Sequence, residues 1–331
     1  MSNPRILFFA LTLVFFSCEK EKKTPPPAPA QQAQAPKLSA PSFNADSAYW
    51  FVEKQVKFGP RNPNSRGHAE CARWLSAELK KYADNVIEQT AALRAFDGKM
   101  LNAVNFIAEF NPQAANRILL CAHWDTRPFA DQDTARKNEP ILGANDGGSG
   151  VGVLLEMARQ LKTHQPGVGV DIILFDAEDY GQPEESAFTP QEDTYCLGSQ
   201  YWGKNKHKKD YQAQFGILLD MVGGKDARFV WENTSVNFAE RILSKVWGVA
   251  NETGYGSYFN YFRKGGLTDD HLYINQLTGI PTIDIIEFNM GSPSGTFHPA
   301  WHTHADNMDV IDRNTLKAVG QTLLEVVFRE K

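Results

Sequence analysis

Cysteine is scarce in this sequence, with four residues in a chain of 331. Three of them, Cys71, Cys121 and Cys196, lie beyond residue 18, and none belongs to a CxxC pair. An odd number of cysteines argues against a fold held by a disulfide framework, although the pattern leaves a single pair open. Cys121 lies in an apolar stretch, which indicates a small core residue rather than a nucleophile.

Long hydrophobic runs are absent apart from one near the N-terminus. Residues 6–16 are almost entirely apolar, follow a basic residue and precede Ser17 and Cys18. This run is too short to span a bilayer, but it has the length of a signal-peptide core. We therefore predict a signal peptide over residues 1–17 and a lipid-modified Cys18, as in bacterial lipoproteins, with an unlipidated secretory signal as the alternative.

The next segment has little that could build a core. Residues 18–39 are charged at first and then rich in proline, alanine and glutamine, which predicts an extended tether. The globular domain is expected over residues 40–331. These segments together predict an exported protein of the periplasm or cell envelope, attached to the membrane through Cys18.

An excess of basic charge is also missing. The chain has 34 Lys and Arg against 39 Asp and Glu, a net charge of −5, and no basic stripe. This composition argues against a nucleic acid as partner. We find no internal repeat and no second domain boundary, so about 290 residues remain for one large domain with a well-buried core.

Within that domain, helical and strand patterns alternate. Four short apolar runs, at residues 118–121, 171–175, 215–219 and 281–286, predict buried strands, and residues 86–110 predict an antiparallel pair. Helical periodicity is found at residues 45–58, 68–82, 236–249 and 313–328, and after residue 150. The expected fold is a single α/β domain with a central mixed, mostly parallel β-sheet flanked by helices on both faces. Two long polar loops are expected at residues 127–140 and 180–195.

Polar side chains gather where three of the predicted strands end. His123 and Asp125 follow the first, the acids of residues 176–179 follow the second, and Asp220 ends the third. Because α/β folds place their sites at the carboxyl ends of strands, we expect these side chains to meet. A further segment at residues 301–306 contains two histidines and an acid, and histidine with several carboxylates is a ligand set of the zinc type.

A glycine-rich segment at residues 143–150 lies between these strands and runs into a helix. Its central polar residue is Asp146. Glycine-rich turns before helices often bind phosphate, but an acidic centre favours a cation instead. Taken alone, Asp146 is equally well explained as a helix cap.

In this order the motifs resemble those of the zinc aminopeptidases and, more closely, of the glutaminyl-peptide cyclotransferases, which share their fold. The resemblance extends over residues 43–330. In an aminopeptidase it would imply one zinc on His123, Asp146 and Asp220, a second on Asp146, Asp179 and His302, and Glu178 as general base. In a cyclase it implies one zinc per chain, bound by Asp146, Asp179 and His302.

Three features favour the cyclase resemblance. Asp269 adds an acid to the Asp-His pair of the aminopeptidases, Trp301 directly precedes the ligand His302, and Asp306 is followed by Asn where aminopeptidases have Thr. The sequence also departs from the animal cyclases, which have Glu at the position of Asp179 and a tryptophan in the loop that follows. We expect Tyr180, Phe188 or Trp202 to close the pocket instead.

The resemblance implies cyclisation of an N-terminal glutamine with release of ammonia. Glu178 would take the proton from the amine and return it to the leaving nitrogen. Asp269 and Asp220 would share a proton between them and hydrogen-bond the γ-amide nitrogen. Trp301 and Phe297 would pack on the side chain of the substrate. We assign helix capping to Asp270 rather than to Asp269, and place His298 and His304 outside the ligand set. The expected partners are peptides and proteins with N-terminal glutamine. Two alternatives stay open: an exported two-zinc aminopeptidase and a binding lipoprotein with an inactive site.

Overall fold

Three parallel strands form the centre of the domain, and every residue in them is buried. They are β3 (Arg117–His123), β4 (Gly169–Phe175) and β5 (Phe215–Asp220). In the computed structural model, β3 lies between β4 and β5, and β8 (Thr282–Ile286) pairs in parallel with β5. Strands buried on both faces need apolar side chains at successive positions, which is the pattern found in the sequence.

The other side of the sheet is antiparallel. β1 (Asn85–Arg94) and β2 (Met100–Phe110) form a hairpin, and β2 pairs antiparallel with β4. The six-stranded order is β1-β2-β4-β3-β5-β8. Exposed and partly buried residues alternate along most of β1, as expected for an edge strand with one solvated side.

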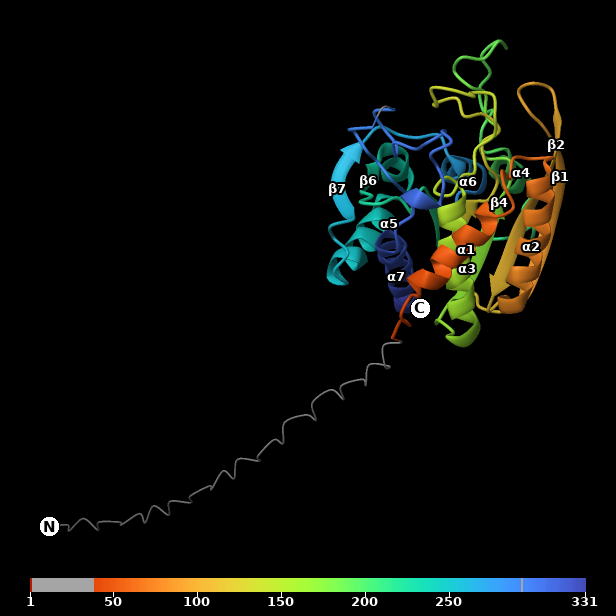
Figure 1. Cartoon of the computed structure of the whole chain (residues 1–331). Coiled ribbons are helices and arrows are strands. Elements are labelled where there is room, and N and C mark those ends of the chain that lie inside the picture. The colour runs from red at the N-terminus through yellow and green to blue at the C-terminus, as the bar shows by residue number, and fades with distance from the viewer. Residues whose placement is uncertain (2–38, 293) are drawn as a thin grey trace. The chain divides into compact units, whose positions relative to one another are not determined.

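Helices cover both faces of the sheet (Figure 1). Ile118, Leu120 and Ala122 of β3 face a large core with α1 (Ala45–Val56), α2 (Arg66–Tyr82), α3 (Gly148–Thr163), α5 (Asn233–Glu252) and α7 (Arg313–Arg329). Leu119 and Cys121 face a smaller core with α4 (Leu197–Lys204) and α6 (Asp270–Thr278). The predicted mixed, mostly parallel sheet between two helical layers is therefore confirmed.

The structure adds elements that the sequence analysis did not predict. The short helices α4 and α6 form on the second face, and β6 (Phe229–Glu232) and β7 (Phe259–Lys264) pair as a separate parallel two-stranded sheet. A single 3-10 turn is formed by Met308–Val310. The two long loops are found as expected, without helix or strand, and Figure 1 shows both extending from the same end of the domain.

The structure describes Met1, residues 39–292 and residues 294–331. Apart from Met1, these residues belong to one compact unit. The predicted signal peptide, Cys18 and nearly all of the predicted tether lie outside the described residues. Within the described part of the chain, no helix has both the length and the apolar content required to cross a bilayer.

Candidate active site

The ends of three neighbouring strands bring acids and a histidine to one edge of the sheet. β3 ends at His123, β5 ends at Asp220, and β4 is followed directly by residues 176–179. Because β4, β3 and β5 are adjacent and parallel, their carboxyl ends coincide. The predicted meeting of these side chains is what the structure shows.

The glycine-rich turn lies against the same edge and presents Asp146. Its backbone is held by Asp306, whose carboxylate accepts hydrogen bonds from the N–H groups of Asn145 at 2.7 Å and Asp146 at 3.0 Å. Gly147 has φ +82°, and a Cβ atom there would lie 2.6 Å from the carbonyl oxygen of Asp125. Only glycine fits both the left-handed conformation and this close approach.

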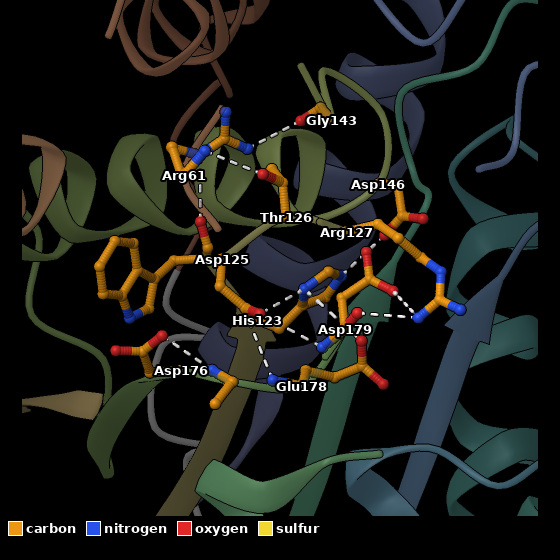
Figure 2. Close-up of polar contacts among 12 residues, drawn as sticks. Arg61, His123, Asp125, Thr126, Arg127, Gly143, Asp146, Asp176, Glu178 and Asp179 are labelled. Carbon is orange, nitrogen blue, oxygen red and sulfur yellow. Dashed lines mark hydrogen bonds and ion pairs between the residues drawn. The ribbon is translucent and has the colours of Figure 1, made fainter. Parts of the chain in front are cut away.

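Two groups of three potential ligands share Asp146. In the first, His123 Nε2 lies 3.1 Å from Asp146 Oδ1 and 3.3 Å from Asp220 Oδ1. In the second, His302 Nε2 lies 3.2 Å from Asp179 Oδ1 and 3.7 Å from Asp146 Oδ2. Within each group, one donor atom from every residue lies within 4.8 Å of the other two. Figure 2 shows His123, Asp146, Glu178 and Asp179 converging on one region. Both ligand sets considered from the sequence are thus assembled.

His302 lies against an ion pair, formed by a buried arginine and a partly exposed aspartate, that the sequence analysis missed. Its Nδ1 lies 3.2 Å from Asp131 Oδ1, and Arg127 donates to both oxygens of Asp131, at 2.9 and 2.8 Å. Arg127 is fully buried and also donates to the backbone carbonyls of Asp179 and Gly181. These contacts place a carboxylate behind the imidazole that would bind a metal, which is the arrangement generally found for metal-ligating histidines. No local pattern marks Arg127, because an arginine in a polar loop is ordinarily exposed.

Asp125 holds the segment after β4 in place. Its two carboxylate oxygens accept hydrogen bonds from the N–H groups of Glu178 at 3.0 Å and Asp179 at 3.2 Å (Figure 2). Directly before Glu178, Ala177 has φ +53°, a conformation that non-glycine residues rarely adopt. The strand-end kink therefore aims Glu178 and Asp179 at the site, and Asp125 stabilises that kink.

The charges of the site are those of a cation-binding site. Burial, together with the Asp146 carboxylate, raises the pKa of Asp179 to about 6, and burial raises the pKa of Asp220 to about 7. Burial lowers the pKa of His123, but hydrogen bonds with neighbouring carboxylates outweigh this and raise it well above the usual value. Asp179 Oδ2 is buried and has no hydrogen-bond partner among the described residues. Clustered buried carboxylates of this kind are stabilised by a divalent ion, so the donors fit zinc.

Comparison with known families identifies the family to which a chain with this site belongs. Residues 105–327 match the family described as peptidase family M28. The chain belongs to peptidase family M28. The matched range contains both ligand groups, and the family resemblance predicted from the sequence is confirmed.

Individual M28 relatives differ in their activities. A glutaminyl cyclase from Bacteroides thetaiotaomicron, solved with N-acetylhistamine, is 52% identical, with a TM-score of 0.86, covering 88% of this chain and 100% of that one. A zinc-dependent exopeptidase from Parabacteroides distasonis is 50% identical, with the same TM-score and coverage. The aminopeptidase YwaD of Bacillus subtilis is 27% identical over 251 residues, which are 73% of this chain. The chain spans about half the length of that curated relative (47%).

In this M28 chain a further acid lies beside Glu178. One oxygen of Asp269 lies within 4.8 Å of donor atoms of both Glu178 and Cys196. Asp269 also caps α6, since its Oδ1 accepts the N–H of Asp270 at 2.5 Å. The assignment of capping to Asp270 was therefore wrong: Asp270 is the first helical residue and its carboxylate is completely buried. Asp269 Oδ2 stays without a hydrogen-bond partner among the described residues.

Two of the predicted pocket aromatics lie beside the M28 ligands. The ring of Trp301 stacks on His302 with centroids 3.8 Å apart, and Phe297 packs on Trp301 at 4.8 Å. Both aromatic side chains are half-buried. They can therefore contact a substrate held at His302.

Two of the other three predicted pocket aromatics lie elsewhere. Trp202 is fully buried between Phe175 and Tyr211 in the smaller core, so it cannot close the pocket. Tyr180 is also buried and packs on Phe129, with its hydroxyl bound by Lys99 at 2.9 Å. Both predictions were wrong because Trp202, on α4, and Tyr180, at the start of the loop, pack into apolar clusters, where they bury more apolar area. Phe188 is the named alternative that remains about half exposed, at 49%.

The cysteines beyond residue 18 are free. Cys71, Cys121 and Cys196 are all buried, and none is paired with another. The single disulfide that the sequence left open is therefore not formed among the described residues. Cys196 is the one that lies near the site.

Proposed function

We propose that this chain is a glutaminyl-peptide cyclotransferase that converts an N-terminal glutamine to pyroglutamate and releases ammonia. The observation that carries the proposal is the buried Asp269 beside Glu178. Activation of water by an aminopeptidase needs a base and metal ions. A cyclase must also hold the γ-amide in place, which calls for an acceptor aimed at the amide nitrogen. The similarity to a solved glutaminyl cyclase supports the same assignment.

The site would hold one zinc on Asp146, Asp179 and His302. When bound there, zinc supplies a Lewis acid that polarises a carbonyl oxygen. These three residues each offer a donor atom to a common point, and all three are buried. Asp220, whose pKa burial raises to about 7, would keep its place beside His123 as a hydrogen-bonding partner rather than as a ligand.

The remaining chemistry belongs to the side chains of the protein. The α-amine of the substrate forms a bond to the carbonyl carbon (Cδ) of its own glutamine side-chain amide, and the bond from that carbon to the amide nitrogen breaks. Glu178 would take a proton from the amine and give one to the leaving nitrogen, so that ammonia departs. Asp269 would accept a hydrogen bond from the amide, while Trp301 and Phe297 pack on the methylene groups. Because the nucleophile is part of the substrate, the main task of the site is orientation.

A two-zinc aminopeptidase is the second candidate. The observation in its favour is the His123, Asp146 and Asp220 group, which has the geometry of a second ligand set. The solved exopeptidase relative points in the same direction. The two candidates differ in which bond of a glutaminyl peptide breaks.

Mass spectrometry of the peptide Gln-Phe-Ala after incubation with the purified protein tests the proposal. We expect the peptide to lose the mass of one ammonia while its peptide bonds stay intact. A peptide beginning with Leu is the matched control and should remain unchanged. Free glutamine with a shortened peptide, or cleavage of the Leu peptide, would instead establish the aminopeptidase.

We also propose that the protein is exported and attached to the cell envelope through a lipid on Cys18. The support is the signal-peptide pattern of residues 1–17 followed by a proline-rich tether. On this proposal the peptides that it processes are themselves exported, and nucleic acid is not a partner.

Replacement of Cys18 by serine should release the protein from the membrane fraction into the soluble fraction. Its specific activity should be unchanged, because residues 18–39 carry none of the site residues. Fractionation of cells with an activity assay on each fraction makes the measurement. The Cys71→Ser variant serves as control and should stay in the membrane fraction. A Cys18→Ser protein that still sediments with membranes would contradict lipidation at this position.

A further inference from the structure

Glu178, the proposed base, has one direct side-chain hydrogen-bond partner among the described residues, and that partner is a thiol. Cys196 Sγ lies 3.2 Å from Glu178 Oε1. The second carboxylate oxygen, Oε2, lies 3.8 Å from His123 Nδ1, which is beyond hydrogen-bonding distance. The hydrogen bond from Cys196 therefore orients one oxygen of the Glu178 carboxyl group.

The thiol is held in this position by the backbone. The N–H of Cys196 donates to the carbonyl of Glu178 at 2.8 Å, and the N–H of Leu197 donates to the carbonyl of Ala177 at 3.0 Å. At the next position, a Cβ on Gly198 would lie 2.1 Å from the carbonyl oxygen of Asp176, so the two segments are in close contact. These bonds fix the sulfur relative to the carboxyl group in both distance and direction.

Cys196 has a conformation that serves this contact rather than the helix that follows. It precedes α4 at the N-cap position with φ +58°, in the left-handed region, and its side chain makes no capping hydrogen bond. Serine, threonine, aspartate or asparagine at this position would cap the helix more effectively. The thiol points to Glu178 instead, and it is fully buried.

The thiol has a proton to donate. Burial and the neighbouring carboxylates of Glu178, Asp270 and Asp269 raise the pKa of Cys196 well above its usual value. A neutral thiol has a single S–H, and Oε1 of the Glu178 carboxyl group accepts it. An alternative acceptor, Asp269, lies within 4.8 Å of the same sulfur.

We propose that Cys196 is a positioning residue for the reaction, whose S–H orients the Glu178 carboxyl toward the reacting amine. This inference rests on the proposed function of Glu178. Without the S–H donor, the Glu178 carboxyl group loses its direct side-chain hydrogen bond among the described residues and can rotate away from this direction. The fraction of molecules with a correctly aimed base then falls, while substrate binding is unaffected.

The test compares variants at position 196 that retain or remove the donor. Cys196→Ala and Cys196→Gly remove it, and glycine also suits the left-handed backbone, so a folding defect in the alanine variant would not obscure the result. Both should lower kcat by about tenfold, with KM and zinc content unchanged. Cys196→Ser retains a donor and should restore most of the turnover. Cys71→Ala, which deletes a buried thiol elsewhere, should leave kcat at the wild-type level.

A double-mutant cycle distinguishes positioning from a general structural effect. In the Glu178→Gln background, Cys196→Gly should cause no further loss, because the group that it orients no longer transfers a proton. An equal loss in both backgrounds, or a Cys196→Gly variant with wild-type kcat, would overturn the inference. A wild-type protein that forms no pyroglutamyl product would instead refute the proposed function, so the two failures can be told apart.

Discussion

Replacement of Glu178 by glutamine is expected to lower the rate of pyroglutamate formation by about 10²–10⁴-fold, the range typical for loss of a general acid–base group. Glutamine keeps the size and shape of the side chain but cannot carry the proton from the amine to the leaving nitrogen. The N–H of residue 178 is bound by Asp125, so the segment that also presents Asp179 should keep its conformation. Zinc content should therefore stay at the wild-type level.

Rates from mass spectrometry and zinc from elemental analysis of the same preparation provide the two measurements. Low turnover with full zinc assigns the proton transfer to Glu178. Near-wild-type turnover would mean that another group transfers the proton, and the neighbouring Asp269 would be the next residue to replace. Loss of zinc would show that residue 178 serves the metal site as well.

Replacement of His302 by alanine should remove zinc and activity together. This imidazole supplies the only nitrogen in the proposed ligand set, and the ion pair of Asp131 and Arg127 lies behind it. A site with two carboxylates alone cannot complete the tetrahedral set that zinc prefers. We expect the variant to be an apoprotein whose activity falls to background and is not restored by equimolar zinc.

The neighbouring His304 offers a matched control. Its Nδ1 pairs with Asp133 at 2.8 Å, and it belongs to neither ligand group. The His304→Ala variant should retain zinc, close to one ion per chain in the cyclase assignment, and most of its activity. Two tightly bound zinc ions in the wild-type protein would favour the aminopeptidase, with His123 and Asp220 as ligands of the second ion.

The apolar patterns of the sequence were sufficient to predict the layers of the fold and the edge at which polar side chains meet, whereas the ligand groups were implied by the family resemblance. Strands buried on both faces have to be apolar, so a polar side chain at the end of such a run is conspicuous. His123, Asp220 and the acids after β4 were found in this way, and the structure places them at one edge. Asp146 was found because five glycines around residue 147 are uncommon in an ordinary helix start.

Features that depend on tertiary packing could not be predicted. Trp202 and Tyr180 were expected in the pocket as replacements for the loop tryptophan of the animal cyclases, but burial in separate apolar clusters decides their direction. Arg127 and Asp131 are indistinguishable from solvent-exposed loop residues until the loop is folded over His302. The helix that starts at Asp270 was missed because nine residues carry too little periodicity to be recognised.

The bond between Asp306 and the glycine-rich turn joins positions that are 160 and 161 residues apart in the sequence. During synthesis, the turn that presents Asp146 is made long before the residue that holds its two N–H groups. His302 belongs to the same late segment as Asp306. Because the proposed zinc site takes His302 from this late segment, we expect a fragment that stops before it to lack the complete ligand set and to be inactive.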